Sequence, residues 1–297
     1  MYIIFPKLNP IIFSIGPISA RWYGFMYFIS LIFALWYGKK IALKNKICNI
    51  KKIETFIYSI FLGACLGGRI GYILFYNFSY FLDNLLCVFY IWKGGMSFHG
   101  GLIGATIAIV YLSFKHKKKI LEISDFIVPL VPFGLGAGRL GNFINSELWG
   151  RVSPNFSYAM IFPNSQNQDL EMIKKYPELK NLLNEYGGLP RHPSQLYEFF
   201  LEGVVLFLII YFFTKKNRPI GSVSGLFLFL YGIFRSILEC FREPDPQIGL
   251  FKNAITMGQI LSIPMIIIGL IILFQTFYKE RIVKKHETIS YTHKKNN

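Results

Sequence analysis

The most regular feature of the chain is a series of long apolar runs separated by short polar segments. Runs of about 18–24 residues are long enough to cross a hydrocarbon layer of ~30 Å as helices. We expect helices at about residues 18–37, 55–76, 96–114, 120–143, 196–213, 220–241 and 254–278. The pattern therefore predicts an all-α polytopic membrane protein with seven transmembrane helices.

Two parts of the chain depart from this pattern. The fourth run carries Pro129 and Pro132, so we expect it to be kinked or broken. The stretch at about 145–194 is polar and rich in Asn, Gln, Glu and Pro, which predicts a small arm or head outside the membrane. We therefore expect one transmembrane domain over residues 1–278, including the arm, and a basic, disordered tail over 279–297.

The distribution of basic residues predicts the orientation. They cluster after the first, third, fifth and seventh runs: Lys39, Lys40, Lys44, Lys46, Lys51 and Lys52; Lys115, Lys117, Lys118 and Lys119; Lys215, Lys216 and Arg218; and the tail from Lys279. Loops rich in Lys and Arg face the cytoplasm. The N-terminus is then outside, the tail is cytoplasmic, and the arm is extracytoplasmic.

Composition excludes several classes of protein. Of the 297 residues, 53% are hydrophobic and 16% are charged, whereas a soluble domain has about 25% charged residues. The net charge of +16 follows the topology of the loops and does not indicate nucleic-acid binding. The four cysteines have no CxxC pairing, so the sequence indicates neither a disulfide framework nor a metal site.

Three arginines lie inside apolar runs, namely Arg69, Arg139 and Arg235. A charged side chain at membrane depth is costly and usually marks a functional site. The predicted orientation places all three in the outer half of the membrane. With Arg242 they outnumber the carboxylates that we expect at this depth, so an external anion is the natural partner. Guanidinium groups suit the phosphate of a phospholipid headgroup.

Further polar residues are expected at the same level: Tyr23, His99, Asn142, Glu147, Tyr231 and Glu239. Several have alternative interpretations. Arg69 fits a functional site and a purely structural role about equally well, because an arginine near a helix end can extend its guanidinium to the headgroups. Arg235 and Glu239 are also consistent with a structural pair one helical turn apart. His99 fits a packed histidine at the membrane interface as well as it fits a catalytic residue.

Two groups of glycines predict close helix contacts, because small residues allow helix backbones to approach each other in lipid. The groups are Gly63, Gly67, Gly68 and Gly71 on the second run, and Gly134, Gly136, Gly138 and Gly141 on the fourth.

Several short segments carry a resemblance to a known family. They are Arg21-Trp-Tyr23-Gly24, Gly68-Arg69-Ile-Gly71-Tyr72, His99-Gly-Gly-Leu, Arg139-Leu-Gly-Asn142-Phe-Ile-Asn-Ser-Glu147-Leu-Trp-Gly150-Arg151, His192-Pro-Ser-Gln-Leu-Tyr197-Glu198, Tyr231-Gly-Ile-Phe-Arg235, Phe241-Arg242-Glu243-Pro-Asp and Met257-Gly-Gln259. Their order resembles the bacterial prolipoprotein diacylglyceryl transferase family over about residues 21–264. Ser146 stands where the family pattern leads us to expect glycine.

The resemblance implies a reaction and its partners. Such enzymes act in the bacterial cytoplasmic (inner) membrane, with the active site toward the periplasm, in the first step of lipoprotein maturation. They transfer the diacylglyceryl group of phosphatidylglycerol to the lipobox cysteine thiol in a prolipoprotein signal peptide. A thioether forms and glycerol 1-phosphate leaves. The family needs no metal or organic cofactor.

The chemistry of this reaction suggests a role for each candidate. Stabilisation of the departing phosphate calls for preorganised cations, and deprotonation of the thiol calls for a base or a cationic field. We assign the phosphate to Arg139 and Arg235, with Asn142 and Tyr231 as hydrogen-bond donors. His99 is the candidate base, Glu147 and Glu239 orient the arginines, and Tyr23 and Arg69 line the lipid pocket.

Two other functions remain open at this point. Helices with internal arginines also line the pathways of anion transporters or phospholipid flippases. Against this, the predicted inner halves of the helices lack matching cations, and no inverted repeat is evident. A scaffolding membrane protein is the third interpretation, but it would not need converging arginines.

Overall fold

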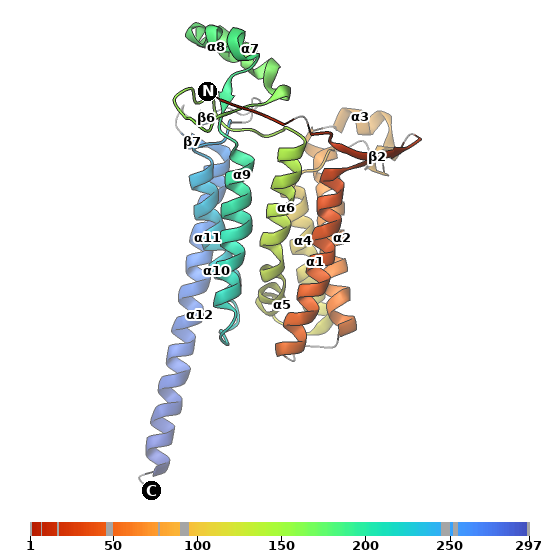
Figure 1. Ribbon diagram of the computed structural model, residues 1–297. Coiled ribbons are helices and arrows are strands. Elements are labelled where there is room, and N and C mark those ends of the chain that lie inside the picture. Colours follow the sequence, from red (N-terminus) through yellow and green to blue (C-terminus); the bar gives the residue numbers. More distant parts are fainter. Residues whose placement is uncertain are drawn as a thin grey trace. The chain divides into compact units, whose positions relative to one another are not determined.

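A computed structural model describes residues 2–6, 8–16, 18–45, 50–76, 78–89, 95–244, 250–251 and 255–295, and the side chains of most of them. The described chain is mostly helical (Figure 1). It divides into two compact units: unit 1 comprises Met1–Ser30 and Val131–Asn297, and unit 2 comprises Leu31–Leu130. Lys46, one of the basic residues after the first run, and Cys48, one of the four cysteines, lie outside the described residues.

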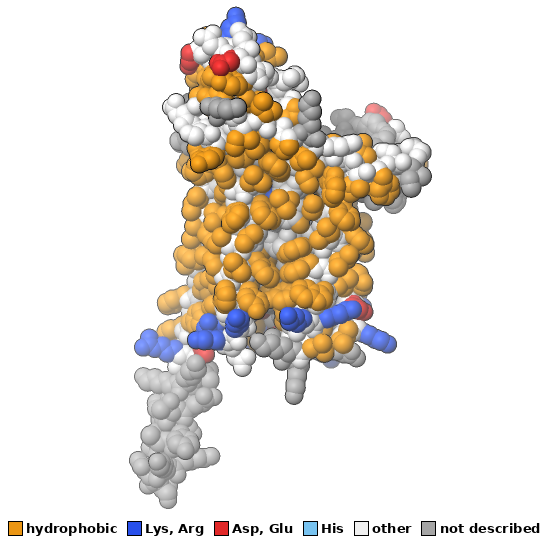
Figure 2. Space-filling view, viewed as in Figure 1, with side chains coloured by type: hydrophobic (Ala, Val, Ile, Leu, Met, Phe, Trp, Pro, Cys, Tyr) orange, Lys and Arg blue, Asp and Glu red, His pale blue; other side chains and the backbone are white. Residues whose placement is uncertain are grey.

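Six described helical segments are long and apolar enough to cross a membrane: Trp22–Leu43, Ile50–Phe75, Phe98–His116, Ile120–Ile144, Ser194–Phe213 and Met257–Ile282. The remaining predicted run corresponds to α11, Ser222–Leu238, which is apolar but has 17 residues. Hydrophobic side chains cover the visible surface of the helices (Figure 2). Phe75, Phe114 and Phe274 are each more than 70% exposed. Such a surface suits lipid, and the structure confirms a polytopic membrane protein.

Unit 2 contains the second and third predicted runs. Its elements are the end of α1 (Trp22–Asn45), α2 (Ile50–Tyr76), α3 (Phe78–Asp83), the 3-10 helix η1 (Leu85–Phe89), α4 (Phe98–His116), α5 (Ile120–Ile127) and the 3-10 helix η3 (Val128–Leu130). Ser97 caps α4, because its side chain accepts a hydrogen bond from the amide of Gly100.

Glycines on both helices form the contact between α2 and α4. A Cβ atom at Gly63 would lie 2.7 Å from the carbonyl oxygen of Gly104, and one at Gly71 would lie 2.8 Å from Cα of Gly100. The helices are therefore in backbone contact, as the small-residue pattern of the second run predicts.

We expect Gly67→Ala to destabilise this helix pair. A Cβ atom at Gly67 would overlap the carbonyl oxygen of Gly100 and would lie 2.8 Å from Cα of Gly104. Because backbone atoms cannot rotate away, we expect a loss of about 1–3 kcal/mol, measurable as a lower melting temperature in detergent. Gly24→Ala is the control, since a Cβ atom at Gly24 meets nothing within 4 Å. An unchanged melting temperature for Gly67→Ala would contradict the packing.

Unit 1 contains the fifth, sixth and seventh runs, the parts of the first and fourth runs outside Leu31–Leu130, and all the described strands. Its helices are the start of α1, α6 (Val131–Ile144), α7 (Gln166–Lys175), α8 (Lys180–Tyr186), α9 (Ser194–Glu198), the π-helix η6 (Phe199–Val205), α10 (Leu206–Phe213), α11 (Ser222–Leu238) and α12 (Met257–Lys295), with 3-10 helices η4 (Pro163–Ser165) and η5 (Pro177–Leu179). Its strands are β1 (Ile3–Ile4), β2 (Ile11–Ile15), β3 (Ile18–Arg21), β4 (Met160–Ile161), β5 (Pro190–Arg191), β6 (Leu250–Phe251) and β7 (Ile255–Thr256). The expectation of an all-α protein therefore needs these short strands added.

Two predictions about helix continuity have different outcomes. The fourth run is interrupted where its prolines lie, with η3 between α5 and α6. The predicted break is confirmed, because a proline removes a backbone donor from the helix. The backbone of α12, in contrast, stays helical to Lys295, through the tail that we expected to be disordered.

The polar segment at 145–194 forms a small head of its own. Its sheet has the order β1-β4-β5, with β1 parallel and β5 antiparallel to β4. Phe5, Met160 and Phe162 form a buried core beneath it. Inside the head, the buried Arg191 donates from Nη2 and Nε to Oδ1 of Asp169, at 2.6 and 2.9 Å. The head thus depends on contacts between residues far apart in the sequence.

Candidate functional site

Arg139 lies one turn before the end of α6 and meets two carboxylates. Its Nε is 3.0 Å from Oε2 of Glu198, and its Nη2 is 3.3 Å from Oε2 of Glu202. Both glutamate side chains are fully buried, whereas 16% of the Arg139 side chain stays exposed. A buried ion pair is stable only when its charges are well matched and hydrogen bonded, so these contacts fix the guanidinium.

Small residues allow α6 and η6 to pack closely enough for these contacts. Gly136 faces Gly203, and a Cβ atom at Gly203 would lie 2.7 Å from Cα of Gly136. Arg139 follows Gly136 by one turn, and Glu202 directly precedes Gly203. The carboxylate also lies on a π-helical segment, a local distortion that is frequent at functional sites.

Arg235 and Arg242 join the same carboxylates from α11 and from the segment after it. Nη1 of Arg235 is 3.1 Å from Oε1 of Glu198, and Nη1 of Arg242 is 3.2 Å from the same oxygen. Arg235 also pairs with Glu239 one turn later, at 2.8 Å, as the spacing predicts. Glu198 therefore connects arginines from three parts of the chain. We call Arg139, Arg235 and Arg242 the arginine array.

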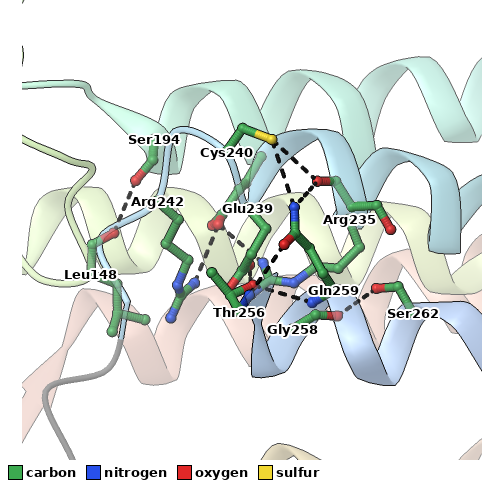
Figure 3. A network of polar contacts seen from close by, with 12 residues as sticks. Leu148, Ser194, Arg235, Glu239, Cys240, Arg242, Thr256, Gly258, Gln259 and Ser262 are labelled. Atoms are coloured by element: carbon green, nitrogen blue, oxygen red, sulfur yellow. Dashed lines mark hydrogen bonds and ion pairs between the residues drawn. The ribbon is translucent and has the colours of Figure 1, made fainter. Parts of the chain in front are cut away.

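The first turn of α12 supports the array from another direction (Figure 3). A Cβ atom at Gly258 would lie 2.6 Å from the carboxyl carbon of Glu239, so this helix packs directly on the carboxylate. Nε2 of Gln259 reaches back to α11, 3.4 Å from the carbonyl oxygen of Ser236 and 3.7 Å from Sγ of Cys240.

The charge balance of the array differs from the sequence-based expectation. Three arginines contact three glutamates, so their formal charges cancel. The predicted excess of cations is therefore wrong for the arginine array. The reason is that the fifth run is not uniformly apolar, since Glu198 and Glu202 lie one turn apart within it. Two ionisable residues at i and i+4 inside an apolar run were the signal that the sequence analysis missed.

Asn142, near the end of α6, contacts Glu147 on the turn that follows the helix. Nδ2 of Asn142 donates to Oε1 of Glu147 at 2.8 Å, and Nδ2 of Asn145 approaches the same oxygen at 3.3 Å. Ser146 adopts a φ of 50° in this turn. Glycine accommodates this left-handed conformation more readily than serine, which agrees with the expectation of glycine at this position.

The same turn is attached to the start of α9. Nε2 of Gln195 donates to the carbonyl oxygen of Glu147 at 2.7 Å, and Oγ of Ser194 donates to that of Leu148 at 3.1 Å. At the base of the head, Nδ1 of His192 is 3.2 Å from the hydroxyl of Tyr197. Burial lowers the pKa of His192, which favours the neutral imidazole near pH 7.

Two predicted tyrosines also belong to this region of unit 1. Tyr231 is buried and stacks on Phe227, and it interacts electrostatically with Arg139 and Glu202. Tyr23 packs on α6 beside Asn142, because a Cβ atom at Gly141 would lie 2.8 Å from its ring. Unit 1 therefore unites seven of the predicted site residues: Tyr23, Arg139, Asn142, Glu147, Tyr231, Arg235 and Glu239.

The other two predicted site residues, Arg69 and His99, belong to unit 2. Arg69 is buried, and it donates from Nε to the carbonyl oxygen of Val88 at 3.2 Å and from Nη1 to that of Gly95 at 3.0 Å. It thus connects α2 to the segment that follows α3. His99 lies exposed in the first turn of α4. Among the described residues, no group of His, Cys, Asp or Glu side chains is arranged to hold a metal ion.

Comparison with known proteins gives a consistent result. The family described as prolipoprotein diacylglyceryl transferase matches residues 10–275. A protein of Buchnera aphidicola subsp. Acyrthosiphon pisum (strain APS), named phosphatidylglycerol–prolipoprotein diacylglyceryl transferase, is 76% identical over 94% of this chain and 100% of its own length. A protein of the same name from Erwinia tasmaniensis is 53% identical over 93% of this chain and 94% of its own length. The chain therefore belongs to the prolipoprotein diacylglyceryl transferase family.

Proposed function

We propose that this chain is a membrane transferase that moves the diacylglyceryl group of phosphatidylglycerol to the cysteine thiol of a prolipoprotein. The observation that carries this proposal is the similarity, over more than nine-tenths of the chain, to proteins named for that activity. The arginine array supports it, because guanidinium groups held in a water-poor site stabilise a developing phosphate charge.

In this reaction a new S–C bond forms to a glyceryl carbon, and the C–O bond between that carbon and the phosphate breaks. The thiol loses its proton, and glycerol 1-phosphate leaves with the electron pair of the broken bond. The acceptor is the lipobox cysteine of a signal peptide, and the product is a thioether. The main requirements are a thiolate nucleophile and a stabilised phosphate leaving group.

Arg139 and Arg235 take the phosphate in this proposal. Their side chains remain 16% exposed while the carboxylate of Glu198 beside them is buried, so the arginine side chains form the accessible side of the array. Asn142 and Tyr231 donate hydrogen bonds to oxygens of the headgroup or the glycerol. Asn142 has a second amide hydrogen for this role, because one is sufficient for its contact with Glu147.

The remaining residues orient the arginines, line the pocket or handle the proton. Glu239 orients Arg235 by direct contact. Glu147 acts through Asn142. Tyr23 lines the lipid pocket in this proposal. The role of Arg69 in lining the pocket and that of His99 as the base for the thiol proton stay predictions from the sequence.

We also propose the topology that the basic loops predict. The chain has seven transmembrane helices, with α11 as the short sixth span, and lies in the bacterial inner membrane. The N-terminus and the head are periplasmic and the tail is cytoplasmic. The site then lies toward the periplasm.

Cysteine labelling tests this orientation. Single cysteines are introduced in the head or in the tail, and intact spheroplasts are treated with a membrane-impermeant reagent. The proposed orientation predicts that only the cysteine in the head reacts.

A reconstituted assay tests the proposed activity. The purified chain is placed in vesicles containing phosphatidylglycerol, and a peptide with a lipobox cysteine is added. Mass spectrometry should show a diacylglyceryl adduct on the cysteine together with released glycerol 1-phosphate. Movement of phospholipid between leaflets without any adduct would instead favour a flippase.

The pH dependence of His99→Gln tests the role of the histidine. If His99 is the base, the variant should lose at least about tenfold in rate near pH 7. A thiol has an ordinary pKa of about 8.5, so a higher pH supplies thiolate without a base and should restore part of the rate. The rate of adduct formation from pH 6.5 to 9.5 is the measurement. A rate equal to that of the unmodified chain at all pH values would remove His99 from the mechanism.

A further inference from the structure

The carboxylates behind the arginine array carry an inference about product release. Glu198 and Glu202 are fully buried, whereas the arginines keep 12–16% exposure. A ligand that approaches the array therefore meets the arginine side chains before these two carboxylates. Glu198 makes three contacts of 3.0–3.2 Å to three arginines. Glu202 makes looser contacts, 3.3 Å to Arg139 and 3.8 Å to Arg235.

The looser contacts of Glu202 make it more important as a counter-charge than as a geometric anchor. Its Oε1 atom is buried and accepts no hydrogen bond from the described residues, which is also true of Oε2 of Glu198. The two carboxylates therefore differ in the lengths of their contacts with the arginines. Such carboxylates are costly to bury. Because Glu202 adds little geometric restraint, its main effect on a bound anion is electrostatic: it reduces the positive potential of the array.

The negative charge of the phosphate group increases during the reaction that we propose. The phosphodiester of phosphatidylglycerol carries a single negative charge, and the released phosphate monoester carries about −1.5 to −2 near pH 7. An array with a large net positive charge would therefore bind the product more strongly than the substrate, because Coulomb energy is proportional to the charge of the ligand. A site with surplus cations would retain its product.

We propose that Glu198 and Glu202 are positioning residues that hold the guanidinium groups from behind and keep the array near neutrality, so that the phosphate monoester is released. This inference rests on the proposed function. Glu198 contributes mainly geometry, and Glu202 contributes mainly charge. Together they allow several arginines to contact one phosphate without binding the product so tightly that its release is slow.

Glu202→Gln tests the inference, because it removes one negative charge and keeps the shape of the side chain. We expect the inhibition constant of glycerol 1-phosphate to fall about tenfold. The KM for phosphatidylglycerol should fall only about threefold, since a ligand with half the charge gains half the energy. A purely structural role would lower the active fraction without tightening inhibition. Glu202→Asp keeps the charge, and its inhibition constant should stay within about twofold of the unmodified chain.

Asp169→Asn is the matched control. It also removes a fully buried carboxylate from an arginine, but in the head, where the partners of Asp169 among the described residues are Ser165, Leu189 and Arg191 and none is an arginine of the array. We therefore expect it to leave the inhibition constant unchanged. If Glu202→Gln does not accumulate in the membrane, Glu239→Gln replaces it, since Glu239 pairs with Arg235 and its loss should also tighten inhibition.

Each outcome decides the proposal. An unchanged or higher inhibition constant in the glutamine variant would overturn it, and so would an equal fall in Asp169→Asn. Absence of the thioether product with the unmodified chain would refute the proposed function instead. In that case, calorimetric binding of glycerol 1-phosphate to the same variants still tests the charge effect separately.

Discussion

Replacement of Arg139 by lysine is expected to lower the rate of thioether formation by about a hundredfold or more, although the positive charge is retained. The guanidinium of Arg139 contacts Glu198 through Nε and Glu202 through Nη2 at the same time. A lysine has a single ammonium and cannot hold two carboxylates and a phosphate in a fixed plane. Loss of one preorganised donor to a developing anion typically costs about 2.7–4 kcal/mol.

Initial rates in phosphatidylglycerol vesicles measure this effect, with the amount of folded protein checked by its melting temperature. Arg218→Lys is the matched control. Arg218 is an exposed arginine that follows α10 and stacks on Phe213, so its replacement should leave the rate within about twofold. An Arg139→Lys variant with more than a tenth of the unmodified rate would argue against a forked contact with the phosphate.

Local chemical rules explain which parts of the fold were predictable. The apolar runs predict the helices because backbone groups in lipid must be satisfied within each helix. Pro129 and Pro132 predict the break before α6, because a proline removes a backbone donor from the helix. The head was not predictable in the same way. Its sheet joins Ile3–Ile4 to Met160–Ile161, and such pairing over more than 150 residues leaves no periodic signal.

Parts of the candidate site were predictable, namely those for which the charge of a residue or its spacing from another along the chain is sufficient. Arg139 and Arg235 stand out because a charge in an apolar run is costly, and the i, i+4 spacing predicts the pair of Arg235 with Glu239. The role of Glu198 depends instead on the approach of η6 to α6 at Gly136, and no feature of the fifth run reveals its partner. Consequently the sequence suggested surplus cations, whereas the structure shows arginines matched by buried glutamates.

Asn142→Ala is expected to reduce thioether formation by about a hundredfold while leaving the protein folded in the membrane. The residue has two proposed functions, which are to hold Glu147 through its 2.8 Å hydrogen bond and to donate its second amide hydrogen to the lipid. Loss of a donor that acts on the reacting group costs about 10²–10³ in rate. Asn142→Asp should be at least as inactive, because it replaces the donor with a carboxylate next to that of Glu147.

Asn145→Ala separates these two functions of Asn142. Nδ2 of Asn145 approaches the same oxygen of Glu147 at 3.3 Å, so its loss also weakens the support of that carboxylate. We propose no contact of Asn145 with the lipid, and we therefore expect a loss of no more than about fivefold, near the ~1 kcal/mol of a typical hydrogen bond. If both alanine variants lost activity equally, Asn142 would act only by holding Glu147, and its proposed contact with the headgroup would have to be abandoned.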